Sequence, residues 1–294
     1  MRTFDYYKPQ TIEGAIELLG MRDKMVFPLA GATDLLPNIR EDLCALDAVV
    51  DIKGLPGLRD IKSECLEPCC GCGPRGCLYV GAAARMNEIV RSDLVKSHWD
   101  ILAQGAASMG NEQVRNRATI GGNLCTSSPA ADTAPALLTL EADVLIAGPR
   151  GERCVPVGNF FIGPKRNVLS PGEFVVALVI PQPPDGAVGV YEKLSRRKAG
   201  DLSIVGVAAL AMPHNGAYRW RIALGAVAPT PVRAPDAEKI LNASFDADAI
   251  ETAARSASDV CSPIEDVRSG AEYRRAMIVN ITRRAIQNVV EKLA

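Results

Sequence analysis

A proline-rich break at residues 181–186 limits the folds open to this chain of 294 residues. It reads PQPPDG, in which the prolines remove backbone donors and fix the backbone, while Asp-Gly favours a turn. No helical or strand periodicity continues through it, so we expect a domain boundary there. A chain of this length with 48% hydrophobic residues is long enough for about two domains.

Short strands and helices alternate on both sides of the break. Near the start, Thr11 precedes apolar residues at one-faced helical spacing, and Gly20 follows where a left-handed cap residue is expected. Ser269 and Glu272 have the spacing of a capping box before a long final helix. By periodicity we expect strands at 26–30, 48–52, 78–82, 144–147, 191–194, 204–211 and 220–226, and helices at 12–19, 86–95, 99–107, 134–140, 248–260 and 271–292.

The charge balance excludes two classes of partner. The 33 basic and 34 acidic residues give a net charge of -1, so no basic field exists to attract nucleic acid or an anionic membrane. No stretch approaches the roughly 20 apolar residues that a membrane span needs, and the N-terminus lacks the apolar core of a signal peptide. We therefore expect a cytoplasmic protein.

The segment LAGATDLLP, from Leu29 to Pro37, directly follows a predicted strand. Backbone amides at such a place can converge on a pyrophosphate, glycine permits close approach, and the hydroxyl of Thr33 adds a donor. The alternative is a plain strand-to-helix turn with Asp34 as its cap.

A second segment, RNRATIGGNL from Arg115 to Leu124, again combines glycines with a hydroxyl and an amide. Two such loops could clamp one dinucleotide from opposite sides. Neither reads GxGxxG, and no acidic residue ends a following strand at the distance that ribose recognition requires, so this is not a Rossmann pattern. A different nucleotide-binding fold is implied.

Four motifs in order resemble the FAD-binding medium subunit of molybdenum hydroxylases of the xanthine dehydrogenase and carbon monoxide dehydrogenase type. They are AGATDLLP (30–37), QVRNRATIGGNLCTSSPAAD (113–132), FFIGPKRNVLSPGEF (160–174) and KLSRRKAGDLSIVG (193–206). The resemblance implies an α+β protein. It would have a two-lobed FAD-binding domain of the vanillyl-alcohol-oxidase (PCMH) type at 1–177, with lobes at about 1–54 and 55–177. A smaller α+β C-terminal domain of the CO dehydrogenase flavoprotein type would follow at 187–294.

The resemblance also implies which residues contact FAD. The loop at 29–35 would lie along the pyrophosphate and ribitol of FAD. The loop at 119–123 would contact FAD from the opposite side, and the remaining residues would approach the adenosine half or the flavin ring. Family members commonly have a second glycine where this chain has Ala32. The expected site consists of Leu29, Ala30, Gly31, Ala32, Thr33, Asp34, Leu35, Met109, Gly110, Thr119, Gly122, Asn123, Thr126, Asp132, Leu169 and Lys193.

Two of these residues have alternative interpretations. A cation at Lys193 near the flavin pyrimidine edge would stabilise negative charge on reduction, but a solvated strand lysine beside three other cations is equally compatible. Asp132 could also cap the helix that begins near Thr133.

Five cysteines fall between residues 65 and 77. Thiolates of Cys65, Cys69, Cys72 and Cys77 could ligate a [4Fe-4S] cluster or a structural zinc. The spacing forms no repeated CxxC knuckle, so an exposed, redox-labile loop is the other interpretation.

The expected activity is electron transfer, and no catalytic residue of this chain is identified. Its two histidines, His98 and His214, lie outside both loops, so we expect FAD to be bound noncovalently. The resemblance implies a large molybdopterin-binding subunit, a small [2Fe-2S] subunit, transfer to NAD+ or another acceptor, and a dimer of heterotrimers. The alternatives are a self-contained FAD oxidase or dehydrogenase, and a metal-stabilised scaffold subunit that has lost FAD.

Overall fold

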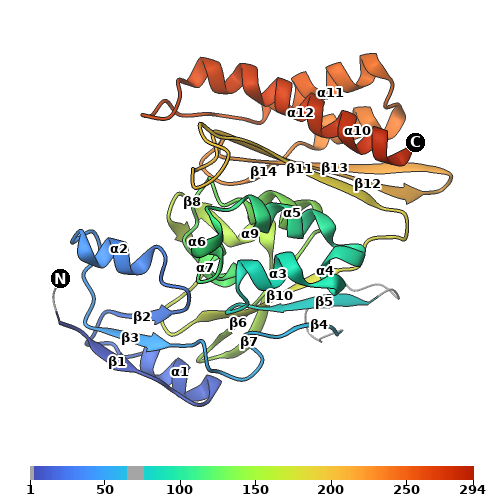
Figure 1. The fold of residues 1–294 in the computed structure, drawn as a ribbon. Coiled ribbons are helices and arrows are strands. Elements are labelled where there is room, and N and C mark those ends of the chain that lie inside the picture. The colour runs from blue at the N-terminus through green and yellow to red at the C-terminus, as the bar shows by residue number, and fades with distance from the viewer. Residues whose placement is uncertain (1–2, 65–75) are drawn as a thin grey trace.

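The computed structural model describes residues 3–64 and 76–294. From the N-terminus, the chain forms a three-stranded sheet, a five-stranded sheet with helices against one face, and a four-stranded sheet covered by the last helices (Figure 1). This arrangement confirms the predicted α+β class with a two-lobed first half. No helix within these two ranges has the length and apolar character needed to cross a membrane.

The first lobe is a parallel sheet in the order β1-β3-β2, with two short helices. Its elements are β1 (Asp5–Tyr7), α1 (Ile12–Leu19), β2 (Val26–Leu29), α2 (Leu35–Arg40) and β3 (Ala48–Asp51). Helix α1 begins as predicted, because the side chain of Thr11 accepts a hydrogen bond from the N–H of Gly14. The predicted left-handed cap at Gly20 is wrong, because the φ of Gly20 is -88° and not positive. The N–H of Gly20 still donates to the carbonyl oxygens of Ile16 and Glu17.

The second lobe has an antiparallel sheet in the order β4-β5-β10-β6-β7. Its strands are β4 (Ile61–Ser63), β5 (Cys77–Gly81), β6 (Asp143–Gly148), β7 (Gly151–Pro156) and β10 (Phe174–Pro181). The central strand, β10, is buried along almost its whole length. The expected domain end at residue 177 therefore falls inside this strand, where Ala177 pairs with β5 and β6.

Helices cover the face of this sheet that looks away from the first lobe. They are α3 (Met86–Arg91), α4 (Asp93–His98), α5 (Asp100–Ser108), α6 (Glu112–Arg115), α7 (Ile120–Cys125), α8 (Thr133–Thr139) and α9 (Val157–Phe160). A small hairpin follows, made of β8 (Phe161–Gly163) and β9 (Arg166–Asn167). The single helix predicted over 86–95 is two helices, because Ser92 leaves the helical conformation and caps α4 through the N–H of Val95.

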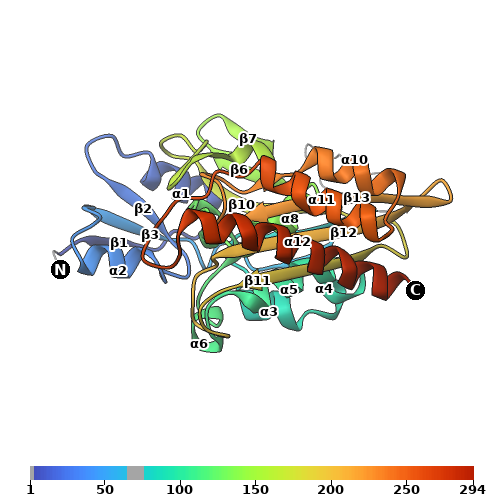
Figure 2. The same ribbon diagram turned by 90° about the horizontal axis from the view of Figure 1, so that it is seen from above.

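The C-terminal half is a four-stranded antiparallel sheet with three helices above it (Figure 2). Its elements are β11 (Val188–Leu194), β12 (Val205–His214), β13 (Ala217–Gly225), β14 (Val232–Arg233), α10 (Pro235–Ala243), α11 (Ala247–Asp259) and α12 (Ala271–Leu293). The predicted capping box at Ser269 is wrong, because Gly270 is the N-cap of α12 and no side chain caps it.

The C-terminal sheet is buried on both faces. Along β12, Val207 and Ala209 pack into the core under α10–α12, whereas Ala208 and Leu210 pack into the core shared with α5 and α8. Successive side chains of a strand point to opposite faces, so one strand serves two cores. The C-terminal sheet is thus fixed directly onto the helices of the second lobe.

Candidate functional site

A cavity of about 350 Å³ lies where the two glycine-containing loops meet. The first loop follows β2, and the second leads into α7. Twelve of the expected site residues line this cavity: Ala30, Gly31, Ala32, Thr33, Asp34, Leu35, Met109, Thr119, Gly122, Asn123, Thr126 and Leu169. Leu29, Gly110, Asp132 and Lys193 are not among the lining residues.

The first loop passes against the backbone of the second with no space for a side chain. A β-carbon on Gly31 would overlap the carbonyl oxygen of Arg117 and lie 2.9 Å from the α-carbon of Ala118. Glycine is therefore required at this position so that the two loops can touch. From the sequence, the same glycine was expected to allow a ligand to approach the loop closely.

Ala32 holds a left-handed backbone conformation with φ of 61°. This conformation is unfavourable for a residue with a β-carbon. The chain turns sharply here, so that β2 can pass into α2, and Ala32 accepts the N–H of Leu36 at 3.2 Å.

The first loop keeps its backbone donors free. Among the described residues, the N–H groups of Ala32, Thr33 and Asp34 donate no hydrogen bond. Asp34 occupies the N-cap position of α2, but its side chain makes no capping bond. Adjacent unpaired N–H groups in a cavity wall are suited to an anionic group such as a pyrophosphate.

The backbone donors of the second loop already have acceptors, partly in the segment after β5 and partly in the loop itself. The N–H of Gly121 bonds the carbonyl of Ala82 at 2.9 Å, and the N–H of Asn123 bonds the carbonyl of Thr119 at 2.9 Å. The hydroxyl of Thr119 caps α7 by accepting the N–H of Gly122 at 3.2 Å. The cavity therefore receives side chains from this loop and from the residue after α7, among them Asn123 and Thr126.

The side chain of Asn123 is held from two sides. Its Oδ1 accepts a hydrogen bond from the hydroxyl of Thr133 at 2.7 Å, and its Nδ2 lies 3.7 Å from the sulfur of Met109 as a donor. Met109 is further fixed because its carbonyl accepts a bond from Arg115 at 3.0 Å. Two cavity residues, Asn123 and Met109, are thus part of one connected polar arrangement.

The hairpin of β8 and β9 brings Lys165 and Leu169 to the cavity. Asn167 connects this hairpin to the second loop, since its Nδ2 donates to the carbonyl of Cys125 at 2.9 Å and its Oδ1 accepts the N–H of Leu169 at 3.1 Å. Glu173 accepts the N–H of Ser170 and two bonds from Arg153, and the Arg153 guanidinium lowers the pKa of this carboxyl.

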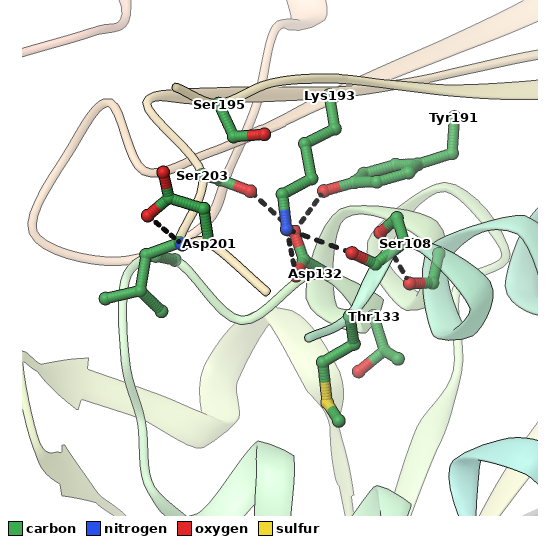
Figure 3. A network of polar contacts seen from close by, with 12 residues as sticks. Ser108, Asp132, Thr133, Tyr191, Lys193, Ser195, Asp201 and Ser203 are labelled. Atoms are coloured by element: carbon green, nitrogen blue, oxygen red, sulfur yellow. Dashed lines mark hydrogen bonds and ion pairs between the residues drawn. The ribbon is translucent and has the colours of Figure 1, made fainter. Parts of the chain in front are cut away.

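Asp132 and Lys193 form an ion pair next to the cavity (Figure 3). Nζ of Lys193 lies 2.8 Å from Oδ2 of Asp132 and 3.0 Å from the carbonyl oxygen of Ser108. Asp132 also accepts the hydroxyls of Tyr191 at 2.9 Å and Ser203 at 2.5 Å. Burial and the nearby charge of Asp132 raise the pKa of Tyr191 well above its usual value, so its oxygen stays protonated.

This network rules out the two alternative interpretations of Lys193 and Asp132. The side chain of Lys193 is only 11% exposed, so it is not a solvated strand lysine. Asp132 stands at the N-cap position of α8 but makes no capping bond, because its carboxylate is directed to the C-terminal sheet instead. Both residues face each other across the two halves of the chain.

Sequence reasoning missed several cavity residues, which are Phe27, Pro28, Asn38, Cys44, Ile52, Ala82, Ala118, Gly121, Cys125, Lys165, Phe174 and Val175. Some were open to prediction: Ala118, Gly121 and Cys125 lie within or beside the second loop already singled out. Others, such as Val175, carry no local signal because they reach the cavity only through the pairing of distant strands.

The cysteine segment supports no metal site in the described part of the chain. Cys65, Cys69 and Cys72 lie outside the described residues. Cys77, at the start of β5, is disulfide-bonded, as is Cys154. Disulfide sulfur is not a thiolate, which corrects the expectation that Cys77 ligates a metal. No group of three or more His, Cys, Asp or Glu within 3–64 and 76–294 could hold a metal ion.

Two family models together match nearly the whole chain. Residues 2–183 match the FAD binding domain in molybdopterin dehydrogenase, and residues 190–289 match the CO dehydrogenase flavoprotein C-terminal domain. The carbon monoxide dehydrogenase medium chain of Hydrogenophaga pseudoflava is 32% identical over 285 residues, 96% of each chain. A putative xanthine dehydrogenase FAD-binding subunit of Escherichia coli is 32% identical over 97% of this chain and 95% of the relative.

Solved structures agree with these matches. A chain of carbon monoxide dehydrogenase from Hydrogenophaga pseudoflava superposes with a TM-score of 0.91 at 33% identity, covering 100% of this chain and 99% of the other. Quinoline 2-oxidoreductase from Pseudomonas putida gives a TM-score of 0.90 at 28% identity, covering 99% and 98%. The chain belongs to the family of FAD-binding medium subunits of molybdenum hydroxylases.

Proposed function

We propose that this chain binds FAD noncovalently in the cavity between the two loops and acts as the last electron carrier of a molybdenum hydroxylase complex. The observation that carries the proposal is the juxtaposition of unpaired N–H groups at 32–34 with the side chains of Asn123 and Thr126 in one cavity. Bound FAD would supply the ability to accept electron pairs and to release them to a chosen acceptor.

The residues present fit such a group. The free N–H groups of Ala32, Thr33 and Asp34 would bind the pyrophosphate, and the hydroxyl of Thr33 would add a donor. Asn123 and Thr126 would bind from the opposite wall, while Met109 and Leu169 would provide apolar contact. Leu29 and Gly110 do not line the cavity, and we propose that they fix the course of the two loops.

The first experiment is a titration of the purified, flavin-free full chain with FAD, followed by flavin fluorescence. We expect saturation at one FAD per chain, and release of free flavin on acid precipitation if the binding is noncovalent. Flavin that stays with the precipitate would overturn noncovalent binding. A folded chain that binds no FAD would overturn the proposal and favour a scaffold role.

The electron path rests on partner subunits. We propose that electrons arrive from the [2Fe-2S] clusters of a small subunit, that a large subunit carries the molybdopterin, and that NAD+ or another acceptor receives the electrons. Relatives described as medium chains support this arrangement. We further propose a dimer of heterotrimers, which mass photometry of the purified complex would test.

The acceptor can be tested with the complex reduced by dithionite under anaerobic conditions. After removal of excess dithionite, addition of NAD+ should yield NADH and restore the oxidised iron–sulfur absorbance in the FAD-loaded complex and not in the same complex stripped of FAD. If a quinone but not NAD+ reoxidises the complex, the acceptor is a quinone and the proposal of NAD+ is wrong. Equal reoxidation of both complexes would exclude this chain from the path. Reduction of the FAD-loaded chain by a substrate in the absence of its partners, followed by reoxidation by an added acceptor, would favour a self-contained oxidase or dehydrogenase.

A further inference from the structure

A buried amide outside the cavity ties helix α3 to the segment that leads into the second loop. Asn87 lies in the first turn of α3 and is only 5% exposed. Its Nδ2 donates to the carbonyl of Glu112 at 3.2 Å and to Oδ1 of Asn116 at 2.7 Å. Its Oδ1 accepts a hydrogen bond from Nε of Arg115 at 3.1 Å. One side chain therefore contacts both ends of α6 and the residue that follows it.

These hydrogen bonds satisfy the buried amide. An asparagine side chain has two donor hydrogens and one carbonyl oxygen, and in Asn87 both hydrogens and the oxygen have partners. If one member of such a set is removed, the buried polar groups that remain lose their partners, which is costly. We therefore expect the position of the Arg115 side chain to depend on Asn87.

Arg115 extends the connection to the cavity wall. Its Nη1 donates to the carbonyl of Met109 at 3.0 Å, and Met109 lines the cavity. The side chain of Arg115 is 16% exposed, so its guanidinium is largely shielded from water, which strengthens its hydrogen bonds. Neither Asn87 nor Arg115 is among the lining residues. A chain of contacts thus runs from Asn87 through Arg115 to Met109.

The backbone beside Asn87 holds the second loop independently of this side chain. The N–H of Met86 donates to the carbonyl of Ala118 at 3.0 Å, and the N–H of Ile120 donates to the carbonyl of Ala84 at 3.0 Å. These backbone bonds do not involve the Asn87 amide. A substitution of Asn87 should therefore leave the second loop in place and act mainly on Arg115.

We propose that Asn87 is a positioning residue, which sets the place of Met109 in the cofactor cavity through Arg115. The inference rests on the proposed binding of FAD in that cavity. It extends the determinants of the flavin site to α3, a fully described helix whose residues do not line the cavity.

The first test compares Arg115→Met with Arg91→Met in the full chain. Both arginines form an ion pair with Glu112, but of the two it is Arg115 that also donates to a residue of the cavity wall. We expect Arg115→Met to weaken FAD binding about threefold to tenfold, measured by titration at a temperature where circular dichroism shows each flavin-free variant to be folded. Arg91→Met is the matched control and should bind FAD like the wild type.

Two substitutions of Asn87 separate positioning from general stability. Asn87→Leu removes the acceptor of Arg115, so FAD affinity should fall as it does in Arg115→Met. Asn87→Asp keeps an oxygen for Arg115 but loses both donor hydrogens, so the free energy of unfolding should fall while FAD affinity stays within about twofold of the wild type. Equal losses of affinity in Asn87→Asp and Asn87→Leu would overturn the positioning role.

A double-mutant cycle tests whether the effect passes through Met109. In a Met109→Ala background the side chain to be positioned is absent, so Arg115→Met should then weaken FAD binding by less than about twofold. An undiminished effect of Arg115→Met in that background would contradict the inference.

Asn87→Leu can fail to fold, because it leaves a donor of Arg115 without its acceptor. Arg115→Met and its control decide the question in that case. If the wild-type chain binds FAD and Arg115→Met behaves like Arg91→Met, the inference fails while the proposed function stands. If the wild-type chain binds no FAD, the proposed function fails and the inference falls with it.

Discussion

The two glycine-containing loops lie against each other, and they use their backbones in opposite ways. In the first loop, N–H groups at 32–34 have no acceptor among the described residues. In the second loop, the corresponding groups bond Ala82, Ala84 or Thr119, so this loop presents side chains. Glycine therefore has two different structural roles at this cavity. Gly31 allows the two loops to touch, and Gly121 allows α7 to begin close to Ala82.

The difference predicts where substitutions act. In the first loop, the course of the backbone should matter more than the side chains. In the second loop, individual side chains should matter more. Four substitutions test this contrast.

Gly31→Ala should have the largest effect. Its β-carbon would force Arg117 and Ala118 away, so we expect FAD affinity to fall by at least about 100-fold, equivalent to about 2.7 kcal/mol. FAD titration and thermal unfolding would measure the change. Gly163→Ala in β8 is the control, because no atom lies within 4 Å of its added β-carbon. Unchanged affinity in Gly31→Ala would show that the contact between the loops is dispensable.

Asn123→Ala should come second, with affinity for FAD about tenfold weaker, because it removes a cavity side chain and leaves Thr133 without its acceptor. Thr33→Ala in the first loop is the comparison, and we expect at most about a threefold change there. Equilibrium titration of both variants gives the ratio. A larger loss for Thr33→Ala would reverse the contrast between the loops.

Thr119→Val removes the cap of α7 while keeping the shape of the side chain. We expect the free energy of unfolding to fall by about 1 kcal/mol, as measured by denaturant titration. Thr119→Ser retains the hydroxyl and should stay close to the wild type. If Thr119→Val leaves the free energy of unfolding unchanged, the capping bond of the Thr119 hydroxyl does not stabilise the second loop.

Ala32→Gly should have the smallest effect and the opposite sign. Glycine adopts positive φ without strain, so we expect a gain of about 0.5 kcal/mol in the free energy of unfolding with FAD affinity retained. Asp42→Gly, at another left-handed position (φ 54°) that does not line the cavity, is the control for a gain unrelated to FAD. Weaker FAD binding in Ala32→Gly alone would mean that the methyl group itself contributes to the site.

Much of the cavity could be predicted because its loops carry local signals. Gly31 and Thr119 stand directly after a strand or before a helix, where small and hydroxyl residues are informative without knowledge of tertiary contacts. The interior of the fold was harder to predict from the sequence. The strand β10 reads FVVALVIP without alternation, because both of its faces are buried, and it lies just before the proline-rich break.

The partners of Asp132 and Lys193 could not be predicted from spacing. These residues are 61 positions apart in the sequence, and their contact depends on how β11 packs beside α5 and β12 packs beside α8. The resemblance named both residues, but only the packing of the two halves shows that they bind each other. The same holds for Asn167, whose bonds to Cys125 and Leu169 join two walls of the cavity.

The double-sided burial of β12 restricts how such chains can diversify. A one-residue shift in this strand would exchange Val207 and Ala209 with Ala208 and Leu210 between two cores at once. The C-terminal half is therefore not an exchangeable module, because a replacement must match the surfaces of α5 and α8 as well as its own helices. Recombination between relatives at the proline-rich break should succeed only when both surfaces come from the same parent.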